Sequence, residues 1–217
     1  RAAHVSVYFR DLHNGPWFGI REREPFTPAS LLKVPILMSY LKLAESNPGV
    51  LAQRLTYTGD QRLPEPTLPS QQRIEAGTPY AVEELLERMI AHSDNRATNA
   101  LVLALDQETL HQTFARLGVP VPDERKLDDP ISVKAYATFF RILFNATYLS
   151  PEMSEKALEL LTKSEFKDGL VAGVPPDVVG AHKCGERSRG DTGRQLHDCG
   201  IVYCPRSPYL LCVMTRG

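Results

Sequence analysis

The sequence has no long apolar run, no excess of either charge and few cysteines, and each of these features excludes a class of protein. No apolar stretch approaches the roughly 20 residues that a membrane-spanning helix needs. Lys and Arg number 25 against 26 Asp and Glu, so the formal net charge is −1 and no overall field favours nucleic acid or an anionic membrane. We therefore expect no nucleic-acid partner and no transmembrane segment in this chain.

The four cysteines all lie late in the chain and form no C-x-x-C pair. They are Cys184, Cys199, Cys204 and Cys212, with His197 as the nearby imidazole. This spacing is not that of a zinc site, so we expect no metal. Most of the thiols are expected to pack as small hydrophobes. One disulfide is compatible with an exported protein, but its pairing does not follow from the sequence.

Strand-like patterns occur at both ends of the chain. Near the start, residues 4–9 alternate polar and apolar types, and residues 17–21 return after a turn at Asn14-Gly15-Pro16. Near the end, residues 178–181, 201–204 and 209–214 form further runs, with a proline-rich turn before the last of them. Connections of hairpin length predict one antiparallel sheet assembled from both chain ends.

The residues between these strands have helical patterns. Residues 31–43 are apolar on most sides, as expected of a buried helix. The predicted helix boundaries are an N-cap and first residue at Thr78-Pro79 before the apolar stripe of residues 82–90, N-caps at Ser132 and Ser150, and a helix end at Gly118. With 217 residues, we expect one α+β domain: a sheet lobe of residues 1–25 and 170–217, and a mainly helical lobe of residues 26–169.

The first chemical signal is Ser30-Leu31-Leu32-Lys33. Residues three apart share a helix face, so Ser30 and Lys33 would point into one cleft. A serine hydroxyl needs a base before it can act as a nucleophile, and a lysine can be that base if burial and a nearby positive charge lower its pKa. A helix N-terminus also offers backbone N–H groups to an oxyanion. The alternative interpretation is that Ser30 is only a helix N-cap.

The same spacing occurs at Ser39–Lys42 and at Ser164–Lys167, so the surrounding residues have to separate the three pairs. Ser30 follows the helix-entry signal Thr27-Pro28-Ala29, whereas Ser39 lies well inside the predicted helix and Ser164 follows the end of another. Pro35 conflicts with a regular helix, because it lacks the N–H that would bond to the carbonyl four residues before it. We expect a tightened or kinked first turn there.

The second signal is Ser93-Asp94-Asn95, just after the amphipathic helix. It is either a polar turn in which Asp94 caps the next helix, or a site at which Ser93 relays a proton and Asn95 bonds a substrate amide. The third signal is His182-Lys183-Cys184-Gly185-Glu186 on a predicted strand. Lys183 is either a solvated lysine of an edge strand, or the ligand of a substrate carboxylate whose charge lowers the pKa of Lys33.

Together, in this order, these three motifs resemble the S-x-x-K, S-D-N and K-T-G elements of the class A β-lactamase and penicillin-binding protein superfamily. The resemblance covers nearly the whole chain. It implies that Ser30 is the nucleophile, Lys33 its base and Ser93 the proton shuttle. It also implies that Asn95 binds a substrate amide and Lys183 anchors a carboxylate.

The resemblance further implies that the backbone N–H groups of Ser30 and Glu186 form the oxyanion hole, with Gly185 leaving room for a close backbone approach. Two departures bear on activity. Cys184 stands where the family has a threonine or serine hydroxyl, and a thiol is a weaker donor for a carboxylate. The family's water-activating glutamate motif is missing from residues 117–130, where Glu124, Asp128 and Asp129 are candidates by residue type.

We therefore expect a serine hydrolase that opens a β-lactam, or the acyl-D-Ala amide of a peptidoglycan stem peptide, through a Ser30 acyl-enzyme with slow deacylation and no cofactor. The alternatives are a D,D-peptidase or penicillin-binding protein, and a sensor or scaffold that binds β-lactams without hydrolysing them. The chain begins at Arg1 rather than Met, and we interpret it as a trimmed, extracytoplasmic protein whose export signal or anchor is absent.

Overall fold

The computed structural model describes residues 2–13, 15–59, 73–117, 130–189 and 193–217, and its longer strands lie near the two chain ends with the helices between them. The strands are β1 (His4–Asp11), β2 (Trp17–Ile20), β3 (Pro25–Phe26), β4 (Arg54–Thr56), β5 (Pro79–Ala81), β6 (Ile131–Ser132), β7 (Gly180–Arg189), β8 (Gly193–Val202) and β9 (Tyr209–Arg216). The α-helices are α1 (Lys33–Ser46), α2 (Val82–Ala91), α3 (Asn95–Ala104), α4 (Gln107–Arg116), α5 (Val133–Phe144) and α6 (Pro151–Thr162). Three 3₁₀ helices complete the set: η1 (Ala29–Leu32), η2 (Pro48–Ala52) and η3 (Leu170–Gly173).

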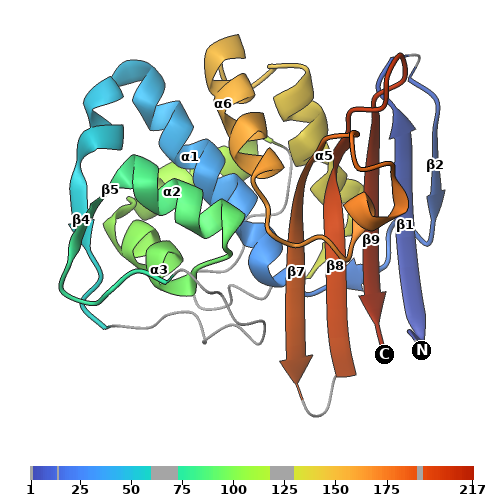
Figure 1. The fold of residues 1–217 in the computed structure, drawn as a ribbon, viewed down its shortest axis with the longest axis horizontal. Helices are drawn as coiled ribbons and strands as arrows, with labels where there is room; N and C mark the ends of the chain where they lie inside the picture. Colours follow the sequence, from blue (N-terminus) through green and yellow to red (C-terminus); the bar gives the residue numbers. More distant parts are fainter. Residues whose placement is uncertain (1, 14, 60–72, 118–129, 190–192) are drawn as a thin grey trace.

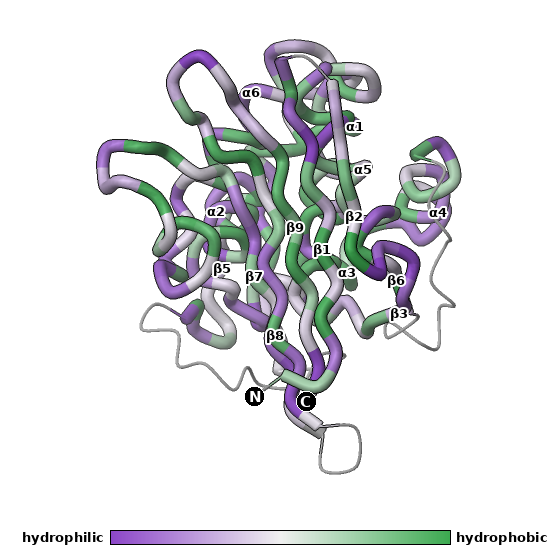
Figure 2. The backbone as a smooth tube through the Cα atoms, turned by 90° about the vertical axis from the view of Figure 1, so that its right-hand side faces the viewer, coloured by the Kyte–Doolittle hydropathy of each residue, from purple (hydrophilic) through white to green (hydrophobic). Residues whose placement is uncertain are grey.

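Strands from both chain ends form one five-stranded sheet in the order β2-β1-β9-β8-β7, and every neighbouring pair in it is antiparallel. The helices lie on one side of this sheet, and the two chain termini lie close together at the same end of it (Figure 1). In Figure 2 the sheet is in front of the helices, with α5 behind β1 and β9. The predicted α+β architecture, with a sheet from both termini, is confirmed.

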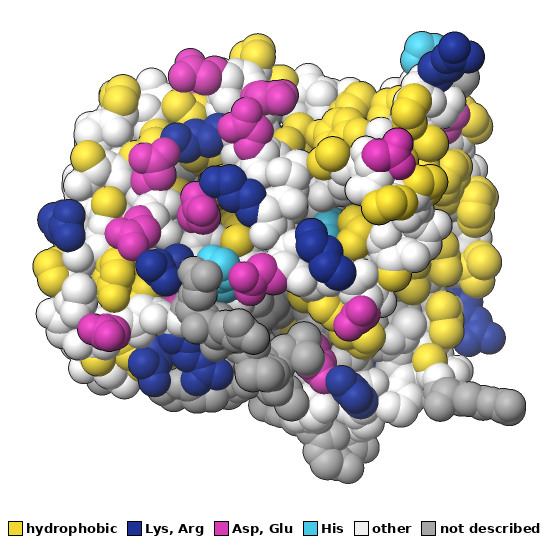
Figure 3. Space-filling view, in the orientation of Figure 1, with side chains coloured by type: hydrophobic (Ala, Val, Ile, Leu, Met, Phe, Trp, Pro, Cys, Tyr) yellow, Lys and Arg dark blue, Asp and Glu magenta, His cyan; other side chains and the backbone are white. Residues whose placement is uncertain are grey.

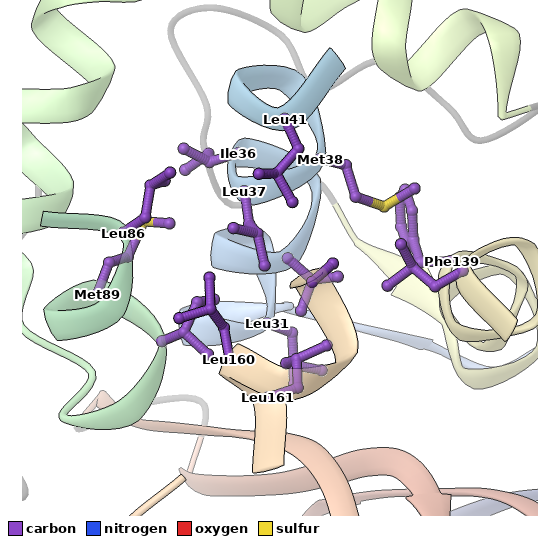
Figure 4. Close-up of a cluster of buried hydrophobic side chains, with 14 of the residues drawn as sticks. Leu31, Ile36, Leu37, Met38, Leu41, Leu86, Met89, Phe139, Leu160 and Leu161 are labelled. Atoms are coloured by element: carbon purple, nitrogen blue, oxygen red, sulfur yellow. The ribbon is translucent and has the colours of Figure 1, made fainter. Parts of the chain in front are cut away.

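The core fills the space between the sheet and α1, which is surrounded by other helices. Ten of its fourteen residues are buried, so α1 is apolar on nearly every side, as the sequence predicts. Ile36 of α1 lies toward Leu86 of α2, and Met38 lies toward Phe139 of α5 on the opposite side of the helix (Figure 4). Each fully buried side chain of this kind contributes about 1.5–3 kcal/mol to folding. Charged side chains are scattered over the helices, whereas apolar ones gather over the sheet (Figure 3).

The predicted start of the second helix at Thr78-Pro79 is wrong. Pro79, Tyr80 and Ala81 form β5 and pair with β4, and the Pro79 carbonyl accepts a hydrogen bond from the Arg54 guanidinium at 2.6 Å. The helix begins at Val82, with Glu83 and Glu84 in its first turn. Proline is compatible with the first residue of a short strand as well as with a helix start, so pairing with a distant segment decides between the two.

The predicted strands near the end of the chain are too short. β7 runs from Gly180 to Arg189, and β8 from Gly193 to Val202 rather than over residues 201–204. The first six residues of β8 include Gln195, His197 and Asp198, polar residue types that do not by themselves predict a strand. All three are buried, because each has a hydrogen-bond partner within the protein.

No helix among the described residues is both long and apolar enough to cross a bilayer. Cys199 and Cys212 lie opposite each other on β8 and β9 and form a disulfide, whereas Cys184 and Cys204 are free thiols. Two of the four thiols are therefore unavailable to a metal. Among the described residues, no cluster of three or more His, Cys, Asp or Glu side chains is arranged to hold one.

Candidate active site

Ser30 lies in a tight turn at the entrance to α1. The turn is the 3₁₀ helix η1, in which the Leu31 N–H donates to the Pro28 carbonyl at 3.0 Å, and regular α-helix begins only at Lys33. Ala29 enters the turn with a φ of 50°, a left-handed conformation that is unfavourable for alanine. The structure thus has the tightened first turn that Pro35 predicts. Ser30 is half-buried in it.

Lys33 is buried and faces the loop between α2 and α3. Its Nζ donates to the Ser93 carbonyl at 2.7 Å, to Ser93 Oγ at 3.0 Å and to Asn95 Oδ1 at 2.6 Å. These three acceptors match the three donors of an ammonium group. Ser30 Oγ is not among the hydrogen-bond partners of Lys33 Nζ in the described part of the structure. Catalytic hydrogen bonds are often long in a free enzyme and shorten when substrate binds.

Ser93 Oγ lies between two buried lysines. Lys183 of β7 donates to it at 3.0 Å, the same distance as Lys33 does from the other side, and also to the Cys184 carbonyl at 3.3 Å. Lys183 is only 1% exposed, so the interpretation of it as a solvated lysine is wrong, although β7 is an edge strand. The structure therefore brings together one residue from each of the three sequence motifs.

Burial lowers the pKa of both lysines. For Lys33 the main cause is its removal from water, and the positive charge of Lys183 lowers its pKa further, well below the usual 10.5. For Lys183 burial is again the main cause, opposed by the charges of Cys184 and Asp198. A buried pair of like charges is costly, so at least one of the two amines is readily neutral and able to accept a proton.

Asp94 holds the loop that presents Ser93 and Asn95. Its carboxylate accepts hydrogen bonds from the N–H groups of Ile74 at 2.8 Å, Arg96 at 2.8 Å and Ala97 at 3.4 Å. It is thus the N-cap of α3, as the turn interpretation of this motif predicts. Ser93, with a φ of 54°, is the second residue of the site in a strained conformation. The two interpretations of this motif are therefore compatible: Asp94 caps α3, and Ser93 and Asn95 both accept hydrogen bonds from Lys33.

β7 packs directly against the turn that carries Ser30. A Cβ on Gly185 would lie 2.9 Å from the Pro28 carbonyl oxygen and 3.3 Å from the Leu31 nitrogen. Glycine is required here because β7 and η1 approach so closely. Cys184, the next residue before it, is buried and lies opposite Asp198 of β8. Burial raises the pKa of the Cys184 thiol, mainly by excluding water.

Glu186 follows Gly185, and its carboxylate is nearly buried and pairs with Arg194 of β8. Its backbone is in the β7–β8 ladder, opposite Leu196. The candidate water-activating residues Glu124, Asp128 and Asp129 lie outside the described residues. Among those described, no carboxylate is hydrogen-bonded to Lys33 or Lys183.

The two other S-x-x-K pairs have different surroundings. Ser39 Oγ is buried inside α1 and bonds to the Pro35 carbonyl and to Thr113. Lys42 pairs with Glu45 and with the Tyr148 carbonyl. Ser164 is buried beyond the end of α6, whereas Lys167 is exposed. Ser39 does have a second hydroxyl beside it, that of Thr113, but among the described residues no hydrogen bond links either pair to a second lysine, as Ser93 links Lys33 to Lys183.

Sequence reasoning missed three supporting contacts. Tyr136 of α5 donates a hydrogen bond to the Leu31 carbonyl at 2.9 Å. Behind Lys183, His182 Nδ1 lies 2.9 Å from Asp198 Oδ1, and the second Asp198 oxygen accepts the Leu170 N–H at 2.8 Å. Tyr136 and Asp198 belong to none of the three motifs, and His182, although it opens the third, was given no role there. The only sign of these contacts in the sequence is that aromatic or charged residues occupy positions of α5, β7 and β8 where an apolar residue is expected.

The fold is that of class A β-lactamases and related penicillin-binding proteins. The structure of PBP-A is similar over 98% of this chain and 81% of that one, with a TM-score of 0.83 and 27% identity. A PBP-A variant solved as an acyl-enzyme complex with penicillin G is 28% identical, with the same TM-score. The class A β-lactamase from Mycobacterium abscessus also has a TM-score of 0.83, at 25% identity over 99% of this chain and 85% of that one.

Sequence comparison gives the same grouping. The β-lactamases of Streptomyces fradiae and Streptomyces albus G are 25% and 26% identical to this chain over 98% of its length, which is 74% and 72% of theirs. The sequence profile of the β-lactamase enzyme family matches residues 1–217. The chain belongs to that family.

Proposed function

We propose that this protein is a serine hydrolase that opens a β-lactam, or the acyl-D-Ala amide of a peptidoglycan stem peptide, through an acyl-enzyme on Ser30. The observation that carries the proposal is the position of Ser93 Oγ, 3.0 Å from both Lys33 Nζ and Lys183 Nζ, next to the turn that holds Ser30. A packing role for these residues does not explain two buried lysines that converge on one hydroxyl.

In the proposed reaction, the Ser30 hydroxyl oxygen attacks the carbonyl carbon of the substrate while neutral Lys33 takes its proton. The backbone N–H groups of Ser30 and Glu186 stabilise the resulting oxyanion. The carbon–nitrogen bond then breaks, and the proton passes from Lys33 through Ser93 Oγ to the leaving nitrogen. Water later cleaves the Ser30 ester.

Substrate binding is assigned to the same short segments. Lys183 attracts the substrate carboxylate. Asn95 gives up its hydrogen bond to Lys33 and bonds an amide group of the substrate instead. Gly185 keeps β7 close to η1, and Cys184 offers a thiol where relatives of this family have a hydroxyl. Because a thiol is a weak donor, recognition of the carboxylate rests mainly on Lys183.

A penicillin-binding peptidase or sensor is the second candidate. It is favoured by the missing glutamate motif and by PBP-A, which has been solved with penicillin G attached to it. In both cases acylation of Ser30 comes first, and the lifetime of the ester separates them. We expect slow deacylation.

The test of the nucleophile is covalent labelling by a fluorescent penicillin. Ser30→Ala should abolish labelling, because it removes the proposed nucleophile, while far-ultraviolet circular dichroism stays unchanged. Ser164→Ala is the matched control, because Ser164 begins another S-x-x-K pair, and it should label like the unmodified protein. Labelling that persists in Ser30→Ala would exclude Ser30 as the nucleophile.

A further inference from the structure

Pro35 leaves a buried carbonyl short of a donor, directly in the turn of the proposed nucleophile. In a regular helix the N–H of residue 35 would bond to the Leu31 carbonyl, and proline has no N–H. Leu31 is completely buried, so water does not replace the missing donor. The Lys33 N–H is shared between the Leu31 and Ser30 carbonyls. The Leu31 carbonyl thus has only a share of this one donor and can accept a second hydrogen bond from a partner elsewhere.

Tyr136 supplies that partner from a different helix. Its hydroxyl donates to the Leu31 carbonyl at 2.9 Å, across 105 residues of sequence. The ring is 1% exposed and packs edge-to-face against Phe139 and Phe140, at centroid distances of 5.5 and 6.0 Å. The ring is thus fixed by packing, and the hydroxyl has a defined position. Burial raises the Tyr136 pKa well above its usual value, so the hydroxyl keeps its proton.

β7 also packs closely against the turn at Leu31. A Cβ on Gly185 would be 3.3 Å from the Leu31 nitrogen, so β7 limits the movement of the turn, while Tyr136 holds it through the Leu31 carbonyl. Ser30 precedes Leu31 directly. A small rotation of this turn would move both the Ser30 hydroxyl and the Ser30 N–H, which is one of the two proposed oxyanion donors.

We infer that Tyr136 is a positioning residue for acylation: its hydroxyl replaces the backbone donor that Pro35 lacks and fixes the orientation of Ser30. This inference rests on the proposed function of Ser30, but the contact itself does not. Tyr136 does not touch the reacting atoms, so its effect has to appear in the rate of acylation rather than in substrate affinity. It also has to depend on which residue occupies position 35.

The experiment is a double-mutant cycle on Tyr136→Phe and Pro35→Ala, read in single-turnover acylation by benzylpenicillin. Tyr136→Phe should slow acylation by about tenfold or more, since small misplacements of a reacting group cost up to about a hundredfold, with little change in apparent affinity. Pro35→Ala restores an N–H to the Leu31 carbonyl. In that background, Tyr136→Phe should cost much less.

Tyr40→Phe is the matched control. Tyr40 is also a buried tyrosine whose hydroxyl donates to a backbone carbonyl, that of Leu101, at 2.7 Å. Its loss should lower stability to a similar extent while acylation stays at the unmodified rate. If Tyr40→Phe and Tyr136→Phe slow acylation equally, or if Pro35→Ala does not reduce the effect of Tyr136→Phe, the inference is wrong.

A second readout separates failure of this inference from failure of the proposed function. The unmodified protein, Tyr136→Phe, Pro35→Ala and the double variant are also unfolded with urea, a measurement that requires no activity. If none of them is acylated but Tyr136→Phe destabilises the protein less in the Pro35→Ala background, the contact stands and the proposed function fails. If all are acylated and the two substitutions are additive in both measurements, the function stands and the role of Tyr136 is refuted.

Discussion

At the scale of single residues, the site depends on the electrostatic relation between Lys33 and Lys183. Neither amine is exposed, and burial is the main cause of the lowered pKa of each. The charge of Lys183 lowers the Lys33 pKa further, and the charge of Asp94, which already accepts three backbone N–H groups, opposes this only in part. Burial and the neighbouring charge thus give Lys33 the lowered pKa that its proposed role as a base requires.

This relation predicts the pH dependence of acylation. Lys33 has to be neutral to accept the Ser30 proton, so the acylation rate should rise with pH through the lowered Lys33 pKa and reach its plateau well below 10.5. Single-turnover rates from about pH 5 to about pH 10 would show the rising limb. Lys183→Met should move that limb to higher pH, whereas Lys183→Arg, which keeps the charge, should leave it in place. A limb that does not move in Lys183→Met would contradict the assigned coupling.

The same shift has a consequence for folding. The unfolded chain binds more protons than the folded one between the lowered Lys33 pKa and 10.5, so the free energy of unfolding should rise with pH across that interval. Lys183 acts in the same direction, because its pKa is also lowered. Both contributions describe a cost of burying charge that disappears as the lysines lose their protons.

Residue types and spacing, together with the order of the motifs, were enough to predict four residues that the structure brings into contact. Ser30, Lys33, Ser93, Asn95 and Lys183 were all predicted from three short motifs, and the structure brings Lys33, Ser93, Asn95 and Lys183 into hydrogen-bond contact. Tyr136 could not be predicted in this way. Its contact joins segments 105 residues apart, and the reason for it is an N–H that is absent from Pro35.

At the scale of elements, the site is made where β7 meets η1 and the loop between α2 and α3. Each of the three contributes one motif, and none holds the site alone. β7 carries Lys183, and its distance from η1 is set at Gly185, where the two backbones are nearly in contact. The relative position of these elements therefore controls the distance from Lys183 to Ser93 and to Ser30.

Gly185→Ala should disturb this junction. The added Cβ would lie 2.9 Å from the Pro28 carbonyl oxygen, so β7 or η1 has to move. We expect a loss of about 1–3 kcal/mol in the free energy of unfolding, together with slower acylation. Gly173→Ala in η3 is the control, because a Cβ there meets no atom within 4 Å. Unchanged acylation in Gly185→Ala would show that the close approach does not matter to the reaction.

The elements themselves were only partly predictable. Helices with clear apolar stripes and serine caps, such as α5 and α6, begin at the predicted Ser132 and Ser150 caps. β8 was mostly missed, because its polar residues are satisfied by partners from other segments, for example Gln195 by the Thr27 N–H. The predicted helix start at Thr78-Pro79 was wrong for a similar reason, because Pro79–Ala81 pair with β4 as a strand. Local patterns do not contain the partner that decides such cases.

At the scale of the whole molecule, family membership and fold agree with the motif order, while the chemistry after acylation is open to test. The chain matches the β-lactamase enzyme family over residues 1–217, yet it lacks the glutamate motif that class A enzymes use to activate water. A scaffold that acylates well but lacks this group should accumulate its ester. The lifetime of that ester is therefore the property that defines what the protein does with a β-lactam.

The most direct measurement is intact-protein mass spectrometry after mixing with benzylpenicillin and with a chromogenic cephalosporin, with absorbance followed in parallel. We predict a mass gain equal to one β-lactam molecule that appears first and decays slowly, with little colour beyond the first turnover. Sustained colour without an accumulating adduct would contradict slow deacylation. The absence of any mass gain with either compound would contradict the central claim, that Ser30 is acylated by β-lactams.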